Sequence, residues 1–208
     1  MKPLIRKIIA VLAAAFILSV AYYGTYLPMR KSQIFISTLK GLRSAKTIED
    51  LVRALSVPLD APSPIGQEEL VRNTSNIFLN LVQQNDKPDV VSASINFVEN
   101  HYRPIIDRGR GMSFEQNLYI LGVINETAFI KTKEIRYLEA AKNYYIQGSR
   151  LGPKRPQFLY GLFDIYRAVG DVENTKKIGE QILSQWPDDE RTSKGLSDFL
   201  GKTLTNSK

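Results

Sequence analysis

Residues 8–27 form a run of twenty side chains without a charge, and this run limits what the chain can fold into. As a helix rising about 1.5 Å per residue it would be roughly 30 Å long, which matches the hydrocarbon core of a bilayer. Basic residues bracket the run on both sides, at Lys2, Arg6, Lys7, Arg30 and Lys31. Near its C-terminal end stand three tyrosines that suit the head-group region, Tyr22, Tyr23 and Tyr26. The sequence therefore predicts a single transmembrane helix, with residues 1–28 as a membrane anchor.

A cleavable signal peptide is the main alternative to a retained anchor. Ser19-Val20-Ala21 is an acceptable small-x-small cleavage site after an apolar run. No clear polar, helix-breaking region separates the run from this site, so the sequence favours a retained signal anchor. A buried helix of a soluble domain is disfavoured by the length of the run and by the charges that bracket it.

The formal net charge of +7 is distributed in a way that argues against a nucleic-acid partner. Residues 1–50 carry eight Lys or Arg and two acids, a net +6, whereas the other 158 residues carry 20 basic and 19 acidic groups, a net +1. Proteins that bind nucleic acid usually concentrate positive charge on their folded domain. Here the excess flanks the apolar run, where anionic lipid head groups are the expected partner.

Charge alone leaves the orientation of the chain open. More basic residues follow the run than precede it, and the positive-inside rule would then place the C-terminal domain in the cytoplasm. A short basic start followed by an apolar run is, however, what export machinery reads, and large domains cross membranes largely regardless of charge.

The residue types that carry catalysis are sparse. The chain has no cysteine and one histidine, His101, which excludes disulfides, thiolate nucleophiles and histidine or cysteine metal clusters. The acidic groups stand where helices are expected to start and carboxylates favour the helix dipole, at Glu49-Asp50, Glu68-Glu69 and Asp188-Asp189-Glu190. No glycine-rich phosphate loop occurs. We therefore expect a protein that is not an enzyme and binds no cofactor or metal; a hydrolase built on His101 or an acidic pair is the least favoured alternative.

After Pro28 the sequence indicates amphipathic helices joined by short connections, because apolar residues recur three and four apart. We expect helices near residues 29–43, 67–84, 88–103 and 114–132, with loops at residues 58–66 and 104–111. Thr47 to Asp50 resembles a capping box, and Ser113 to Gln116 matches one fully. The fold class is therefore all-α, with residues 29–112 as a helical N-terminal part of the soluble domain and residues 113–208 as its C-terminal part.

Residues 156–189 have the length of one tetratricopeptide repeat, a helix–turn–helix unit of about 34 residues. The first helix has a shared apolar face at Leu159, Leu162 and Tyr166. Gly170 suits a left-handed helix end, Asp171 suits a cap of the next helix, and Pro187 stops that helix. The stretch resembles a tetratricopeptide repeat in its length, its turn and its terminal proline.

The stretch departs from the family pattern at several positions. Phe163 stands where a small residue is expected and Gly179 where a bulky one is expected. Leu159 replaces the frequent Trp, and Thr175 replaces Ala. We therefore expect a degenerate repeat whose two helices pack at an unusual spacing.

A second unit precedes it, with the expected Leu121-Gly122 pair and with Ala141, Tyr145 and Gly148 in its second helix. Between the two units lies the sequence GPKRP, in which Pro153 ends one repeat, Pro156 opens the next helix, and Lys154 and Arg155 fill a solvated turn. A last helix near residues 188–204 would cap the array. The resemblance implies a helical-hairpin, tetratricopeptide-like solenoid after the transmembrane helix.

Three stretches, YYGTYLPMRKSQIFISTLKGL, PIGQEEL and YLEAAKNYYIQGSRLGPKRPQFLYGLFDIYRAVGD, resemble a part of bacterial O-antigen ligase or polymerase-type membrane proteins. The similar segment of those proteins follows their last membrane helix and ends in a tetratricopeptide region outside the membrane. Their many-span portion, which carries the glycosyl transfer, is absent from these 208 residues, so no catalytic residue carries over. The resemblance implies a C-terminal domain on the extracytoplasmic face of the cytoplasmic membrane.

Two groups of residues are candidates for binding. In repeats of this type the first helices line a concave groove, and four side chains of the repeat at residues 156–189 would face a protein partner there, Gln157, Tyr160, Asp164 and Arg167. Around residues 103–111 lies the densest basic segment outside the N-terminus, and Arg103, Arg108 and Arg110 are candidates for binding an anion such as a phosphate, a lipid head group or a glycan.

These observations favour a membrane-anchored, tetratricopeptide-like adaptor that binds a protein partner at the outer face of the cytoplasmic membrane, in envelope glycan assembly. The alternative is an accessory or split-off domain of an O-antigen ligase or polymerase-type system, which would bind glycan or a lipid-linked substrate. Neither function involves nucleic acid.

Overall fold

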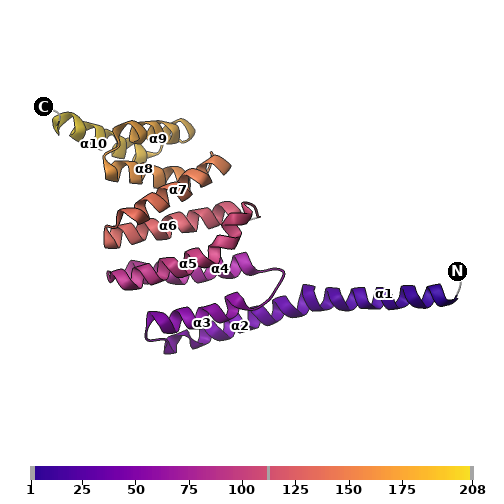
Figure 1. Ribbon diagram of the computed structural model, residues 1–208. Coiled ribbons are helices and arrows are strands. Elements are labelled where there is room, and N and C mark those ends of the chain that lie inside the picture. The colour runs from indigo at the N-terminus through magenta and orange to yellow at the C-terminus, as the bar shows by residue number, and fades with distance from the viewer. Residues whose placement is uncertain (1–2, 112, 207–208) are drawn as a thin grey trace. The chain divides into compact units, whose positions relative to one another are not determined.

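The computed structural model describes residues 3–111 and 113–206, so Lys2 of the basic flank lies outside its scope. Helices make up the regular secondary structure of these ranges, which contain no strand, and the all-α prediction is confirmed. By contact the chain divides into two compact units, one of residues 1–78 and 96–107 and the other of residues 79–95 and 108–208. The helices, labelled in Figure 1, are α1 Pro3–Ala21, α2 Leu27–Gly41, α3 Ile48–Asp60, α4 Gln67–Gln84, α5 Pro88–Arg108, α6 Phe114–Thr132, α7 Ile135–Leu151, α8 Pro156–Val169, α9 Val172–Gln185 and α10 Glu190–Asn206.

The first helix of the chain runs without a break from Pro3 to Ser44. Its middle turn, Tyr22–Tyr26, is π-helical, and the N–H of Leu27 donates to the carbonyl of Tyr22. Pro28 explains this wider turn, because proline has no N–H and its ring crowds the carbonyl four residues earlier. The helix therefore passes through residue 28, where the expected anchor ends, without leaving helical geometry.

Exposure divides this long helix in two. Every residue from 3 to 26 is exposed, whereas Leu27, Lys31 and Phe35 are buried. These three residues are four apart and share one face of α2, which packs against α3. The folded part of the first unit thus begins where the apolar run ends.

In the rest of the first unit, helix α3 begins at a confirmed cap, since the hydroxyl of Thr47 accepts a hydrogen bond from the N–H of Asp50 at 3.1 Å. The rings of Phe78 and Phe97 lie 4.6 Å apart. Helix α5 continues through Pro104 to Arg108, so the expected end at residue 103 is wrong. Tyr102 and Ile105 are both buried, and their packing offsets the cost of the proline.

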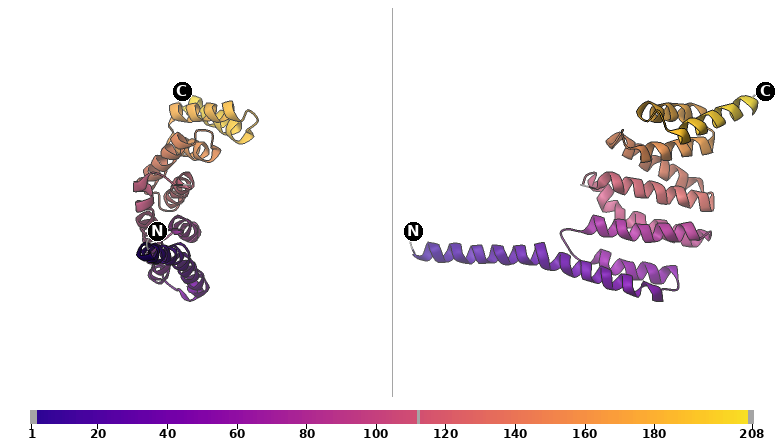
Figure 2. Two further views of the ribbon diagram at one scale, coloured as in Figure 1. Left: turned by 90° about the vertical axis from the view of Figure 1, so that its right-hand side faces the viewer. Right: turned by 180° about the vertical axis from the view of Figure 1, so that it is seen from behind.

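In the second unit, each helix from α6 to α9 pairs with the next one along the chain, and α10 packs on α9 (Figure 2). Helix α8 ends at Gly170 with φ 75°, and the N–H of Asp171 donates to the carbonyl of Tyr166. Asp171 then caps α9 through the N–H of Asn174 at 3.0 Å, so both turn predictions are confirmed. The capping box expected at Ser113 is wrong, because its side chain makes no cap hydrogen bond and its backbone is not extended.

The turn between α7 and α8 is exposed to solvent at residues 153–155, as the sequence predicts. Pro156 occupies the first turn of α8, as expected. Arg155, however, does not simply lie in water, because its Nε pairs with Oε2 of Glu115 on α6 at 2.5 Å. The GPKRP segment therefore joins α7 to α8 and also contacts α6.

The core of the second unit contains two buried aromatic rings that pack directly against glycines. The ring of Tyr145 on α7 lies against Gly122 on α6 and Gly161 on α8, and a Cβ at either glycine would overlap it. Phe158 lies in the same way against Gly148. These glycines let three consecutive helices approach around buried rings.

The α8–α9 hairpin also packs an aromatic ring against a glycine. Phe163 on α8 is 1% exposed, and its ring lies against Gly179 on α9, where a Cβ would be 3.1 Å from Cε2 of Phe163. Leu159 and Ile182 complete this cluster. The large residue at 163 and the small one at 179, each of which departs from the repeat pattern, therefore compensate for one another.

Candidate functional site

The predicted binding strip on α8 is a real cluster, but its side chains already have partners from the start of α10. The hydroxyl of Tyr160 donates to Oδ2 of Asp189. The guanidinium of Arg191 bonds Oδ2 of Asp164 at 2.5 Å and lies 5.5 Å from the centre of the Tyr160 ring. Spacings of three and four along α8 place these residues on one face, and side chains at the start of α10 contact it.

Arg167 and Gln157 lie at the two ends of this strip. Arg167 pairs with Asp164 at 3.6 Å, and its guanidinium lies 5.3 Å from the centre of the Phe163 ring. Gln157, in the first turn of α8, lies outside this set of contacts. The structure therefore brings together Tyr160, Asp164 and Arg167, which are held in fixed, half-buried positions.

The contacts to α10 also set the charges of the strip. Asp189 accepts a second hydrogen bond from the N–H of Thr192 at 2.7 Å, which caps α10. The hydrogen bond from Tyr160 is the main reason that the pKa of Asp189 is lowered, and the same bond raises the pKa of Tyr160. At neutral pH Asp189 is thus a carboxylate and Tyr160 a neutral donor, as their hydrogen bond requires.

Glu126 on α6 extends this cluster and was missed by sequence reasoning. Its Oε2 accepts a hydrogen bond from the Tyr145 hydroxyl at 2.7 Å. Burial raises the pKa of Glu126, and the nearby Asp164 raises it further, while the Tyr145 hydrogen bond and Arg191 oppose the shift. A usable signal exists in the sequence, since Glu126 lies one helical turn after Gly122, the residue that receives the Tyr145 ring.

The carboxylates of this cluster are engaged by donors of the chain itself. The two carboxylates nearest the centre of the cluster, Glu126 and Asp164, are each held by donors from other helices. Within the part of the chain that the structure describes, no group of three His, Cys, Asp or Glu residues is placed to hold a metal ion. What remains accessible is a fixed surface of aromatic, acidic and guanidinium groups.

The three candidate anion-binding arginines take different positions. Arg103 lies on α5 instead of in a loop, and it donates to Oδ1 of Asn100 at 3.3 Å. Arg108 ends α5 and donates from Nε to the carbonyl of Arg110 at 3.3 Å. These contacts show two guanidiniums engaged with acceptors of the chain itself.

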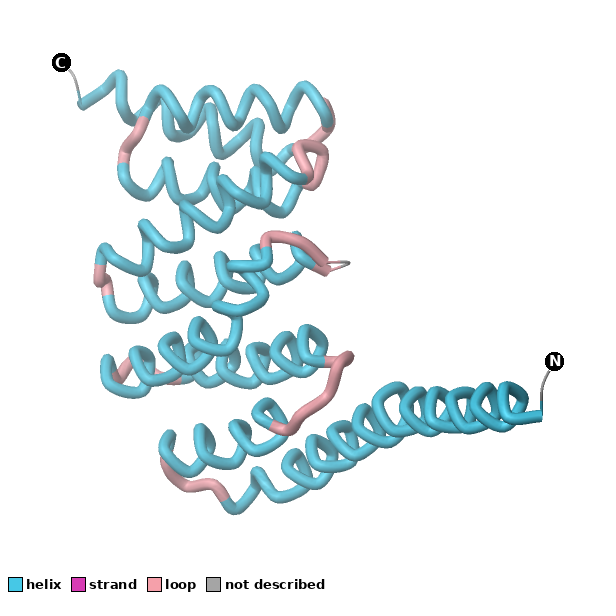
Figure 3. Tube along the Cα trace, turned by 45° about the vertical axis from the view of Figure 1, so that its right-hand side comes forward, coloured by secondary structure: helices cyan, strands magenta, loops and turns pink. Residues whose placement is uncertain are grey.

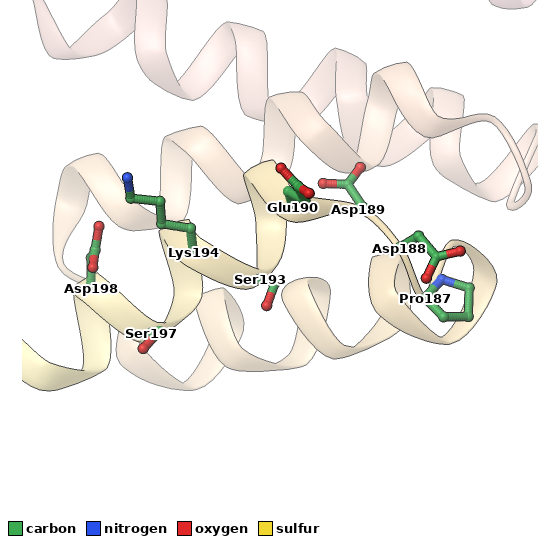
Figure 4. A pocket seen from close by; sticks show the side chains of 8 residues that line it. All are labelled: Pro187, Asp188, Asp189, Glu190, Ser193, Lys194, Ser197 and Asp198. Carbon is green, nitrogen blue, oxygen red and sulfur yellow. The ribbon is translucent and has the colours of Figure 1, made fainter.

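A surface hollow lies beside the first turns of α10 (Figure 4). Asp188 and Asp189 point to different sides in this view, and Asp189 is already bonded to Tyr160 and Thr192. The acidic side chains of the hollow therefore do not converge on one point. Its lining residues are Pro187, Asp188, Asp189, Glu190, Ser193, Lys194, Ser197 and Asp198.

The N-terminal helix has the properties of a membrane span. Among the described residues it is the one helix that is long and apolar enough to cross a bilayer, and none of its apolar stretch is buried. The Tyr22 ring stacks on Tyr26 with 5.5 Å between ring centres and meets Tyr23 edge-on at 5.1 Å. A cleaved signal sequence or a core helix can share this length and composition, but a core helix would be buried.

Lys31 does not act as a free flanking charge, which corrects the expectation from the sequence. It is 4% exposed, and its ammonium donates to the carbonyls of Leu59 at 3.2 Å and Ala61 at 2.7 Å and to Oε1 of Gln67. Burial lowers the pKa of Lys31, while Asp60 opposes that shift. The side chain thus joins α2 to both ends of the loop between α3 and α4.

Comparison with family models, with curated proteins and with solved structures finds no match for this chain. The resemblances to tetratricopeptide repeats and to O-antigen ligase or polymerase-type proteins therefore stay predictions from the sequence. The function of the chain has to be inferred from its own geometry.

Proposed function

We propose that this chain is a membrane-anchored helical scaffold that holds a protein partner beside a membrane without catalysing a reaction. The observation that carries the proposal is the exposed apolar helix, which continues without a break into a helix that packs on a folded unit. An anchor joined in this way holds the first folded unit at a fixed distance from the membrane.

The exposed surface of the N-terminal helix explains why a membrane is the expected environment. Large apolar side chains such as Val11, Phe16 and Leu18 are between 67% and 70% exposed. Leaving that surface in water costs about 25 cal/mol per Å², whereas a helix in lipid satisfies its own backbone hydrogen bonds. Tyrosines at the end of the span suit the head-group layer.

The partner surface that we propose is the face formed by α6, α8 and the start of α10. It presents Tyr160 and Asp164, which contacts to α10 hold in place, and Arg167, which pairs with Asp164. On α6, Glu126 lies near Asp164, and the Tyr119 ring lies near the rings of Tyr145 and Phe158. Side chains that are already ordered lose little entropy on binding, which favours recognition of an extended peptide segment. A tetratricopeptide-like groove would use its first helices in the same way.

We place the folded domain on the extracytoplasmic face of the cytoplasmic membrane, in envelope glycan assembly. The resemblance to the O-antigen ligase region motivates this orientation. With Lys31 buried, four basic side chains remain in the roughly 20 residues after the span, Arg30, Lys40, Arg43 and Lys46, against Lys2, Arg6 and Lys7 before it. An excess of one weakens the charge argument for a cytoplasmic domain without reversing it.

Protease protection tests the orientation. In cells stripped of outer layers but with an intact cytoplasmic membrane, added protease should digest the domain and leave a short membrane fragment. Digestion only after that membrane is lysed would contradict the extracytoplasmic placement.

Capture of partners from a detergent extract tests the scaffold. The variant with Tyr119→Ala and Arg167→Glu should lose the proteins that the wild type recovers, while Lys176→Ala on α9 should keep them. Equal recovery by all three chains would contradict the proposed face. Recovery of a polytopic glycosyltransferase would support the alternative function as its accessory domain.

A further inference from the structure

The loop between α3 and α4, residues 61–66, is fixed at both of its ends to the helix that leaves the membrane. The ammonium of Lys31 donates to the carbonyl of Ala61, where the loop begins, and to Gln67, where α4 begins. Lys31 lies five residues after Tyr26, the last residue of the exposed stretch, which is about 7.5 Å along the helix axis. Side chains on a helix lean toward its N-terminus, so the Lys31 ammonium lies on the membrane side of its own Cα.

The loop itself extends in the same direction. Figures 1 and 3 show it projecting from α3 and α4 toward the part of the long helix where α1 meets α2. The hydroxyl of Ser63 donates to the carbonyl of Ile65 at 2.7 Å, and Gly66 has φ 86°. This tight turn presents the Ile65 side chain, which is 58% exposed.

The composition of the loop suits the boundary between head groups and acyl chains. The sequence APSPIG carries no charge. Pro62 and Pro64 have no N–H, so fewer backbone donors need water when the loop leaves it. On the long helix, within five residues before Lys31, Tyr26 and Met29 are 45% and 49% exposed.

We propose that the loop of residues 61–66 is a second membrane contact, which inserts Ile65 into the lipid interface beside the transmembrane helix. The contact is apolar and needs no anionic lipid, since Glu69 is exposed at the start of α4 and would be repelled by one. Together with the span it fixes the tilt of the first unit against the bilayer. This inference rests on the proposed anchoring by residues 8–27.

The lack of cysteine in the chain makes a labelling test direct. We would reconstitute the full chain in phosphatidylcholine vesicles with one environment-sensitive fluorophore at Ile65→Cys, at Phe16→Cys or at Ile36→Cys, and quench it with brominated lipids. Ile36 is the matched control, because it is 51% exposed and lies about 15 Å beyond Tyr26 along the same helix. We expect strong quenching at 16, clear quenching at 65 that persists without anionic lipid, and none at 36.

The outcomes separate the two proposals. If the label at residue 16 is quenched and the label at residue 65 is quenched no more than the one at residue 36, the loop contact is overturned and the anchor stands. A label at 16 that is not quenched either would overturn the anchor as well. The fluorophore is itself apolar and could draw the loop into lipid. A second pair of variants therefore carries it at Ser63→Cys, one with Ile65 and one with Ile65→Asp. We expect the aspartate to reduce the quenching severalfold. Equal quenching in that pair would also overturn the insertion of Ile65.

Discussion

Tyr145 occupies a space that exists only because two helices carry glycine where they pass its ring. Its hydroxyl then reaches Glu126, so one residue joins α6, α7 and α8 through packing and a hydrogen bond. The raised pKa values of Tyr145 and Glu126 follow from that burial. The core therefore requires glycine at positions 122 and 161, because the Tyr145 ring fills the space that a side chain there would need.

Gly122→Ala should lower the free energy of unfolding by about 1–3 kcal/mol, because the new methyl group overlaps the Tyr145 ring. Urea denaturation of the full chain in detergent measures the change. Gly41→Ala is the matched control, since a Cβ there meets nothing within 4 Å, and it should be neutral or slightly stabilising. Equal effects of the two substitutions would contradict the packing described for Tyr145.

The burial of Tyr102 should make the folded chain less stable at alkaline pH. Burial raises its pKa from 10.0 to about 12, so between these values the unfolded chain releases a proton that the folded chain keeps. Its contribution is complete below pH 10 and is lost as the pH rises toward 12. Wild type should lose about 2 kcal/mol more than Tyr102→Phe between pH 9 and 11.5 in urea titrations. Identical losses would show that Tyr102 titrates normally.

Single residues also show how far sequence reasoning reaches. The left-handed Gly170 and the cap at Asp171 were predictable, because each depends only on local backbone chemistry. The pairing of Phe163 with Gly179 was not, since each residue alone looks like a departure from the repeat. A large and a small residue can exchange places across a helix pair, and only the packed structure reveals which pairs do so.

At the scale of elements, α10 is held on α8 by polar contacts as well as by its apolar face. Asp189 and Arg191 bind the side chains of Tyr160 and Asp164, the residues that the sequence assigned to a partner. The sequence placed these residues on one strip correctly. Their use within the chain was not predictable, because it depends on the angle at which α10 returns.

The double variant Tyr160→Phe with Arg191→Ala should loosen α10. Exposed contacts of this kind contribute about 1 kcal/mol, so amide hydrogens of α10 should exchange roughly fivefold faster while those of α6 and α7 keep their rates. Hydrogen exchange with mass spectrometry measures this. Lys176→Ala, which removes an exposed pair with Glu180 on α9, should change neither region. Unchanged hydrogen exchange in α10 would mean that its apolar face alone holds it in place and that the polar contacts contribute nothing.

The long first helix makes a prediction about processing. The candidate cleavage site Ser19-Val20-Ala21 lies within continuous helix, and the residues after it lead directly into the packed α2. We therefore expect the protein isolated from membranes to keep its N-terminal segment. Intact-mass measurement decides this, and a chain that begins at Tyr22 would show that the segment is a cleaved signal sequence.

Helix boundaries show where element-level prediction fails. The end of α5 was expected at residue 103 because proline at 104 normally stops a helix, yet buried neighbours carry the helix on to Arg108. Lys31 was read as a membrane flank from its position in the sequence alone. Its burial depends on carbonyls of Leu59 and Ala61, nearly thirty residues away, and no local pattern contains that information.

At the scale of the whole molecule, an apolar helix and an amphipathic helix form one continuous rod, with α3 packed on its C-terminal part, α2. The all-α class and the existence of the apolar span could be read from the sequence, since both depend on periodicity and composition. The arrangement of the hairpins could not, because it depends on side-chain exchanges such as the one between residues 163 and 179.

The measurement that tests the membrane anchor most directly is extraction of native membranes at alkaline pH, followed by detection of the full chain in pellet and supernatant. A span of residues 8–27 predicts that the wild type stays in the pellet, and that a variant with Leu12→Arg, Phe16→Arg and Val20→Arg is found in the supernatant. Each arginine at the centre of a span costs about 2.5–3.5 kcal/mol by insertion scales, so three should abolish the anchor. Release of the wild-type chain into the supernatant would contradict the anchor.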